Sequence, residues 1–168
     1  TDGVLTPKQS KEQLIRHTLV DLGLHETLTY TLTSEATVNE FNLFHSLDNT
    51  VKLMSPLGEE RSAARKSLIG SLLQTIHYNN AHSNKDVNIF EIANTYSDKE
   101  VSNLAIAVSG DYVNVPWMGK KEAVDFYLVK GFVETLFKKL CIEESRYTFE
   151  KVEADNKDFH PGRSGYIK

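Results

Sequence analysis

The sequence contains a single cysteine, Cys141, and this scarcity excludes two classes of protein. One thiol forms no internal disulfide framework and completes no multi-cysteine zinc site. Apolar runs are also short, and none approaches the ~20 residues that a helix needs to cross a bilayer. The N-terminus lacks the basic stretch and apolar core of a secretory signal peptide. These absences favour a cytoplasmic protein.

Positive charge is not in excess either. The chain has 19 Lys and Arg residues against 23 Asp and Glu residues, which gives a net charge of -4. Proteins that bind phosphate backbones through their surface usually concentrate basic residues. Here the basic pairs Lys120-Lys121 and Lys138-Lys139 each stand alone and are not part of a longer run of basic residues. The balance argues against a dedicated nucleic-acid surface but leaves room for a local basic patch.

The common catalytic and metal-binding motifs are missing as well. The histidines are scattered, HExxH does not occur, and His77 and His82 fit one helix face poorly. The GxSxG, P-loop and GxGxxG patterns are absent too. Cys141 has no histidine near it in the sequence, so we expect a structural or exposed thiol rather than a nucleophile. The sequence therefore predicts no catalytic, cofactor-binding or metal-binding residue.

What the chain does have is the composition of a globular protein. Its 168 residues are 40% hydrophobic and 25% charged, and a chain of this length buries roughly 70% of the surface that it exposes when unfolded. It begins at Thr1 without an initiator methionine and stops at Lys168 within a pattern typical of a strand. We therefore expect a single domain over residues 1–168, cut from a longer protein.

Three helices are predicted from apolar residues spaced by three or four positions. Ser10 and Gln13 fit a capping box for the first helix, and Gly23 fits its end. The second is expected over residues 67–80, and the third from its cap residue Asp125 to about residue 140. The apolar face of the first helix consists of Leu14, Ile15, Leu19 and Leu22.

Strands are predicted from β-branched and aromatic residues bounded by turn residues. They cover residues 27–33, 51–54, 87–92, 104–108 and 147–152. The polar stretch 94–102 predicts that the third and fourth strands form an antiparallel pair joined by an exposed loop. Because strands and helices mix without strict βαβ alternation, we expect the α+β class, with a mainly antiparallel sheet flanked by helices.

Two charged segments fit either a ligand site or ordinary surface structure. Residues 59–66 contain two acids followed by three bases, and a solvated approach to the second helix is the simpler interpretation. His160–Ser164 contains Pro161-Gly162, which sets a tight turn from which Arg163 projects. That arginine would bind an anion or a partner carboxylate, or would merely follow the turn.

Taken in order, these segments resemble a known family. The segments are Ser55–Ser62, Arg65–Leu68 with Leu72-Leu73, Asn88–Ile92, Trp117, Val124–Phe126 with Lys130-Gly131, and His160–Ser164. Their order and spacing closely resemble the bacterial phenylalanyl-tRNA synthetase β subunit over nearly the whole chain. The resemblance falls in the class II synthetase-like, non-catalytic core region of that subunit.

The resemblance implies both a fold and a role. The fold would be that of a class II aminoacyl-tRNA synthetase, truncated at its C-terminus, in one pseudo-catalytic domain over residues 1–168. In this family the α subunit activates phenylalanine with ATP and Mg²⁺. The β region packs against α and helps to build an (αβ)₂ heterotetramer that charges tRNA(Phe). The fragment itself would bind no cofactor and would be no enzyme. The family-motif residues are Arg65, Glu91, Asp125, Lys130, His160 and Arg163.

Several residues agree with a loss of catalysis. A class II synthetase uses an arginine of its second motif to hold the α-phosphate of ATP, because adenylyl transfer needs charge stabilisation at phosphorus. Residues 90–96 resemble the start of that motif, yet Ser97 follows and Asp98 adds negative charge. No glycine-rich third motif precedes Lys168. Residues 63–67 and 93–94 also depart from the family pattern, which weakens the case for a ligand role there.

We therefore predict a structural domain that contacts other parts of a phenylalanine–tRNA ligase, namely the α subunit and the remaining β-subunit domains. The apolar face of the first helix is the candidate contact with α, because class II synthetases commonly dimerise through a long early helix. Packing of this face on the chain's own sheet fits equally well. The alternative function is a module that contacts tRNA directly through Lys120, Lys121 and Arg163. An independent ATP-using ligase has the least support.

Overall fold

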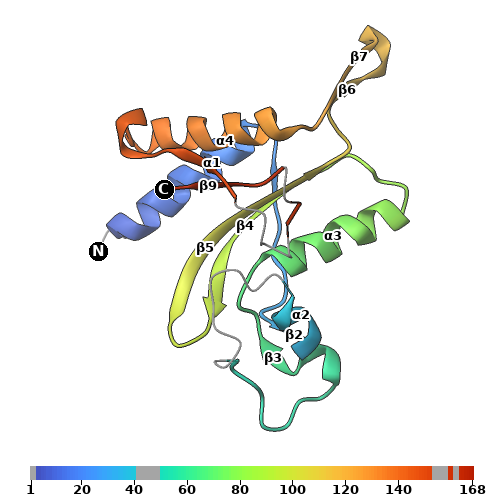
Figure 1. Cartoon of the computed structure of the whole chain (residues 1–168), viewed down its shortest axis with the longest axis vertical. Coiled ribbons are helices and arrows are strands. Elements are labelled where there is room, and N and C mark those ends of the chain that lie inside the picture. The colour runs from blue at the N-terminus through green and yellow to red at the C-terminus, as the bar shows by residue number, and fades with distance from the viewer. Residues whose placement is uncertain (1–2, 41–49, 153–158, 161–162) are drawn as a thin grey trace. The chain divides into compact units, whose positions relative to one another are not determined.

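The computed structural model describes residues 3–40, 50–152, 159–160 and 163–168. The chain divides into two compact units, one formed by Thr1–Leu24 with Val124–Lys168 and the other by His25–Ala123. Figure 1 labels the elements of both units. Among the described residues, no helix is long and apolar enough to cross a membrane.

The first unit begins with α1, Pro7–Asp21. Thr6 caps this helix in place of the predicted Ser10: the Gln9 N–H donates to Thr6 Oγ1 at 3.3 Å, and the Thr6 N–H donates to Gln9 Oε1 at 2.9 Å. The helix starts early because this reciprocal box precedes a proline, whose missing N–H is not needed in the first turn. The predicted end is confirmed, since Gly23 has a left-handed backbone with φ 83°.

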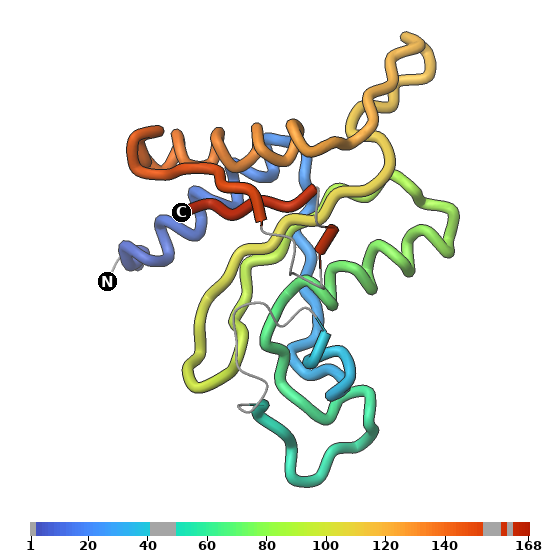
Figure 2. The backbone as a smooth tube through the Cα atoms, viewed as in Figure 1, coloured from blue at the N-terminus to red at the C-terminus, as the bar shows by residue number. Residues whose placement is uncertain are grey.

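The second helix of this unit is α4, Phe126–Lys139, which packs on α1. Its predicted cap is confirmed, because Asp125 Oδ1 accepts the Leu128 N–H at 2.7 Å. The chain then forms η3 (Glu144–Arg146), β8 (Phe149–Lys151) and β9 (Gly165–Ile167). The two strands pair antiparallel, with Phe149 opposite Ile167. The tube in Figure 2 shows α1 and α4 side by side.

The second unit is built on a long antiparallel hairpin. In it, β4 (Val87–Tyr96) pairs with β5 (Glu100–Ser109) along its whole length, and β1 (His25–Glu26) adds to β4 in parallel. The predicted antiparallel pairing is confirmed. The predicted loop over residues 94–102 is wrong, because only residues 97–99 lie outside the ladder. Polar residues continue the strands there because they bond to each other; Asn103 Nδ2 donates to Thr95 Oγ1 at 2.6 Å.

The predicted middle helix is confirmed as α3, Ile69–Ala81, which covers this hairpin. Its Leu72 is 1% exposed and packs with Val87 and Ile89 of β4. Ile76, one turn further along α3, adds to the same cluster, because residues four apart share a helix face. Ala105 and Ala107 of β5 complete it. Burial of these side chains, at about 25 cal/mol per Å² of apolar surface, holds the helix on the hairpin.

The remaining elements of the second unit are short. They are β2 (Leu32–Thr33), α2 (Glu35–Asn39), η1 (Glu59–Arg61), β3 (Ala63–Ala64), β6 (Asp111–Val115), η2 (Pro116–Met118) and β7 (Lys120–Ala123). The predicted strand 27–33 shrinks to β2 because the Thr29 N–H bonds to a carboxylate instead of a strand partner. The predicted strand 51–54 is wrong; Lys52 makes an isolated bridge to Ala63. The expected α+β class is confirmed, and only the β1–β4 pairing is parallel among the described strands.

Asp86 anchors the β6–β7 hairpin to the loop before β4. Its Oδ1 accepts the Asp111 N–H at 2.9 Å, and Asn114 Nδ2 donates to Oδ2 at 3.0 Å. Gly110 precedes the hairpin with φ 80°, and a Cβ on it would meet the Lys85 carbonyl oxygen, so glycine is required there. The bond from Asn114, followed by that from Asp111, lowers the pKa of the Asp86 carboxyl.

We predict that acid loosens this hairpin. Because the pKa of Asp86 is lower in the folded chain, its bonds stabilise the fold fully above the ordinary carboxyl pKa and are lost as the pH falls through the lowered value. Trp117 is the only tryptophan and is 85% exposed in η2, between the hairpin strands. Its fluorescence anisotropy should fall on acidification, and Asp86→Asn should remove most of this step. An identical step in the variant would contradict the assignment to Asp86.

Candidate functional site

Arg65 lies at the centre of a buried polar cluster in the second unit. Its side chain is 4% exposed, and that of Glu91 is 1% exposed. Arg65 Nη1 lies 2.9 Å from Glu91 Oε1 and also donates to Thr29 Oγ1 at 2.7 Å. Arg65 Nε donates to the carbonyl oxygen of Asn94 at 3.2 Å. The guanidinium is therefore enclosed by protein acceptors and does not face solvent.

Thr29 completes the compensation of the buried charges. Its N–H donates to Glu91 Oε1 at 3.1 Å, and its hydroxyl donates to Glu91 Oε2 at 2.7 Å. The backbone of Arg65 adds two more links, because its N–H donates to the Thr31 carbonyl at 3.0 Å and its carbonyl accepts the Tyr96 N–H at 2.9 Å. A buried ion pair is tolerated when further bonds satisfy its atoms in this way.

This cluster corrects the solvated interpretation of residues 59–66. Glu59 and Glu60 are exposed as expected, but Arg65 is 3% exposed and Lys66 is 2% exposed. The preceding β3 pairs with β2 and is itself buried, so the chain enters the interior before α3 begins. The two family-motif residues Arg65 and Glu91 are thus brought together. Thr29 was missed, and the sequence offered no signal for it beyond a hydroxyl in an expected strand.

The turn between β4 and β5 stands where the sequence resembles the start of a class II phosphate-binding motif. Its residues are Ser97, Asp98 and Lys99, and the Ser97 N–H donates to the Lys99 carbonyl at 3.3 Å. The turn is short because Tyr96 already pairs with Glu100. It contains one base, Lys99, and no arginine.

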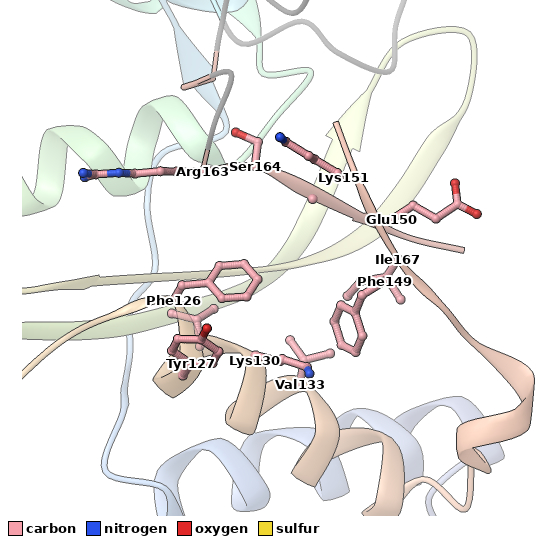
Figure 3. A pocket seen from close by; sticks show the side chains of 12 residues that line it. Phe126, Tyr127, Lys130, Val133, Phe149, Glu150, Lys151, Arg163, Ser164 and Ile167 are labelled. Atoms are coloured by element: carbon pink, nitrogen blue, oxygen red, sulfur yellow. The ribbon is translucent and has the colours of Figure 1, made fainter. Parts of the chain in front are cut away.

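A groove in the first unit is lined by two of the other family-motif residues, Lys130 and Arg163. It encloses about 560 Å³ between α4 and the β8–β9 hairpin. Figure 3 shows Phe126, Val133 and Phe149 converging on it, with Lys130 beside them. Asp125 caps α4 at this end, and the His160 carbonyl accepts the N–H of Arg163, which lines the groove. The turn predicted at Pro161-Gly162 lies outside the described residues.

The charges of the groove are unevenly compensated. Lys130 Nζ lies 3.4 Å from Glu134 Oε1, and Lys168 Nζ lies 2.6 Å from Glu150 Oε2. The hydrogen bond to Glu150 raises the pKa of Lys168. Lys151 and Arg163 line the groove, and within the described ranges neither forms an ion pair. The arrangement suits an apolar group with an anion beside it.

The other predicted residues do not form a site. Lys120 lies 3.3 Å from Glu122 and Lys121 lies 2.9 Å from Asp111, so both lysines form ion pairs with acidic neighbours. Cys141 is exposed. In the part of the chain that the structure describes, no group of three or more His, Cys, Asp and Glu side chains gathers to hold a metal.

The candidate contact face of α1 is partly buried within the chain. Leu19 is 0% exposed, whereas Leu14 is 39% exposed. Ile15 and Leu22 are half-buried. Leu19 therefore belongs to the chain's own core, and a partner would reach Leu14 and, in part, its two half-buried neighbours.

We predict strong coupling between Arg65 and Glu91. Arg65→Met and Glu91→Gln should each lower the free energy of unfolding by about 3–5 kcal/mol, because each leaves a buried charge without its partner. The double variant should cost far less than the sum of the two. Urea denaturation followed by circular dichroism measures these values. Lys52→Met, in the exposed pair that Lys52 forms with Glu35 at 2.6 Å, should cost about 1 kcal/mol or less. Additive single-variant costs at residues 65 and 91 would refute the coupling.

Comparisons with known proteins agree with one another. A family model described as "Phenylalanyl tRNA synthetase beta chain CLM domain" matches residues 1–168. Proteins named phenylalanine–tRNA ligase beta subunit from Staphylococcus aureus strains Mu50 and N315 are 36% identical over 174 residues, which cover 99% of this chain and 21% of each relative. The chain thus spans about a fifth of the length of the curated relatives it matches.

Solved structures resemble the fold at low identity. The pyrrolysyl-tRNA synthetase PylSc of Desulfitobacterium hafniense has a TM-score of 0.63 at 14% identity, covering 85% of this chain and 49% of that one. A second structure of pyrrolysyl-tRNA synthetase from the same organism has a TM-score of 0.61 at 16% identity, covering 87% and 50%. Both are class II synthetases, so the likeness supports the expected class II-like fold.

Proposed function

Because the chain belongs to the phenylalanyl-tRNA synthetase β-chain family, we propose that it is a non-catalytic, subunit-contacting domain of a phenylalanine–tRNA ligase. The match of the family model to the whole chain carries this proposal. The chain acts as one synthetase-like domain within a longer β subunit, in the cytoplasm, as part of an (αβ)₂ heterotetramer. The α subunit activates phenylalanine with ATP and Mg²⁺, and the assembly charges tRNA(Phe).

Three features support the absence of catalysis in this domain. Adenylate formation needs a cation at the α-phosphate. Arg65 is enclosed by Glu91 and Thr29, and the turn between β4 and β5 contains no arginine. In addition, Leu72 of α3 and its neighbours fill the face of the hairpin that α3 covers. The domain keeps the core of a synthetase fold while lacking, at these positions, an exposed arginine that would hold a nucleotide phosphate.

The alternative of direct tRNA binding is not favoured. Binding to a phosphate backbone depends on basic side chains that neutralise phosphates and so release the counterions of the nucleic acid. Lys120 and Lys121 each have an acidic side chain beside them, Glu122 and Asp111, so these two lysines do not form a purely basic patch. The net charge of the chain is -4. A role in protein contact fits these charges better.

We predict that the chain alone does not activate phenylalanine. Pyrophosphate exchange driven by phenylalanine, ATP and Mg²⁺ should be undetectable, because no phosphate-holding arginine is exposed at the β4–β5 turn. The complete synthetase provides the positive control under the same conditions, and circular dichroism confirms that the isolated chain is folded. Robust exchange by the folded chain would overturn the proposal of a non-catalytic domain.

We further predict that α1 contributes to the contact with the α subunit through Leu14. Leu14→Asp in the complete β subunit should reduce co-purification with α, because it places a charge on an apolar face that is 39% exposed. Val20→Asp is the matched control, since Val20 is 53% exposed and lies outside the predicted contact set. Leu19→Asp is unsuitable, because it would unfold the core. Equal co-purification by the Leu14 and Val20 variants, both folded, would refute a role for this face.

A further inference from the structure

We propose that the groove between α4 and the β8–β9 hairpin receives a segment of the α subunit that presents an apolar side chain next to a carboxylate. This inference rests on the proposed function, because it requires an α subunit. Beyond the proposed function, it names the surface of this chain that contacts the α subunit and the chemical character of that contact.

The apolar floor of the groove consists of side chains from two elements, α4 and the β8–β9 hairpin. On α4, Phe126 and Val133 lie two helical turns apart and therefore share a face. On the hairpin, Phe149 and Ile167 stand opposite each other in the ladder, so both side chains project from the same face. Figure 3 shows these side chains around a common space.

In the part of the chain that the structure describes, this floor stays partly exposed. Phe126 is 56% exposed, Ile167 is 43% exposed and Phe149 is 38% exposed. Tyr127, beside Phe126, is 76% exposed. Clustered apolar and aromatic side chains on a concave surface are typical of sites that bury an anchor residue of a partner. The volume of about 560 Å³ has room for such a side chain.

The charged residues around the floor indicate which charge the partner segment carries. Lys130 forms an ion pair with Glu134, and Glu150 forms an ion pair with Lys168. Lys151 and Arg163 remain as lining cations that, among the described residues, form no ion pair. They stand out because the chain as a whole carries a net charge of -4. An arginine fits a carboxylate through two parallel hydrogen bonds, so an acidic residue beside the anchor completes the match.

A protein segment fits this groove better than a nucleic acid does. Binding of a phosphate backbone needs a row of basic side chains. Here Lys151 and Arg163 share the groove with the carboxylate of Glu150. Aromatic residues and arginine are also the side chains most enriched at the centres of protein–protein contacts.

Photo-crosslinking in the complete synthetase tests what occupies the groove. A photoreactive phenylalanine analogue at position 127 replaces an exposed aromatic side chain of the groove wall. It should crosslink to α, within a segment that contains an apolar residue close to Asp or Glu. The matched control places the same analogue at position 166, whose residue Tyr166 alternates with Ile167 and points to the other face of β9. This control should not capture that segment.

A charge exchange then tests the carboxylate. Arg163→Glu in the complete β subunit should raise the Kd for α on the order of tenfold, the loss of one charge-assisted contact. Reversing the carboxylate of the captured α segment to Lys should restore most of the affinity. Lys139→Glu makes the same change of charge on α4 at a residue that does not line the groove, and it should leave the Kd within about twofold.

The outcomes separate this inference from the proposed function. If α co-purifies with β but position 127 captures another β domain, tRNA or nothing, the groove inference is overturned and the proposed function stands. The same holds if Arg163→Glu binds α with the Kd of the parent chain. If α and the complete β subunit do not associate at all, the proposed function itself fails.

Discussion

The ion pair between Arg65 and Glu91 is the interaction on which the second unit depends. Two charges removed from water must be compensated by nearby atoms, because an uncompensated buried charge destabilises a fold by several kcal/mol. That requirement fixes the position of Thr29, which bonds to both side chains, and of the Asn94 carbonyl. It also explains why residues before β2 leave the strand conformation: their polar groups serve the carboxylate rather than a neighbouring strand.

The ion pair between Arg65 and Glu91 has a structural role and not a ligand-binding one. An arginine that is held by a carboxylate inside the protein supports the sheet but does not reach a ligand. In a synthetase-like core of this kind, the buried charges are compensated by protein atoms and not by a substrate. The groove on the first unit has the complementary character: its cations Lys151 and Arg163 line an open groove with an apolar floor instead of being enclosed by carboxylates. One unit uses its family-motif residues internally, and the other displays them.

Most predictions from the sequence were correct where the responsible interactions are local; the exception is the cap of α1, which is Thr6 rather than Ser10. The periodicities of α1, α3 and α4 and the cap at Asp125 follow from bonds between residues three or four positions apart. Predictions failed where a distant partner decides. Residues 94–96 and 100–102 look like a polar loop, yet cross-strand bonds such as Asn103 to Thr95 keep them in the ladder. Residues 65 and 66 look solvated because they are basic, yet the pairing of β3 with β2 carries them into the interior.

The sequence by itself determined the family, through the order and spacing of its motifs, and the helices, through hydrogen bonds that each helix makes within itself. It also determined the lack of an arginine after Tyr96. Only the tertiary structure decided that Leu19 is core while Leu14 is surface, that Arg65 meets Glu91, and that Lys130 and Arg163 line one groove. The physical reason is that burial and ion pairing are properties of neighbours in space, and those neighbours lie far apart along the chain.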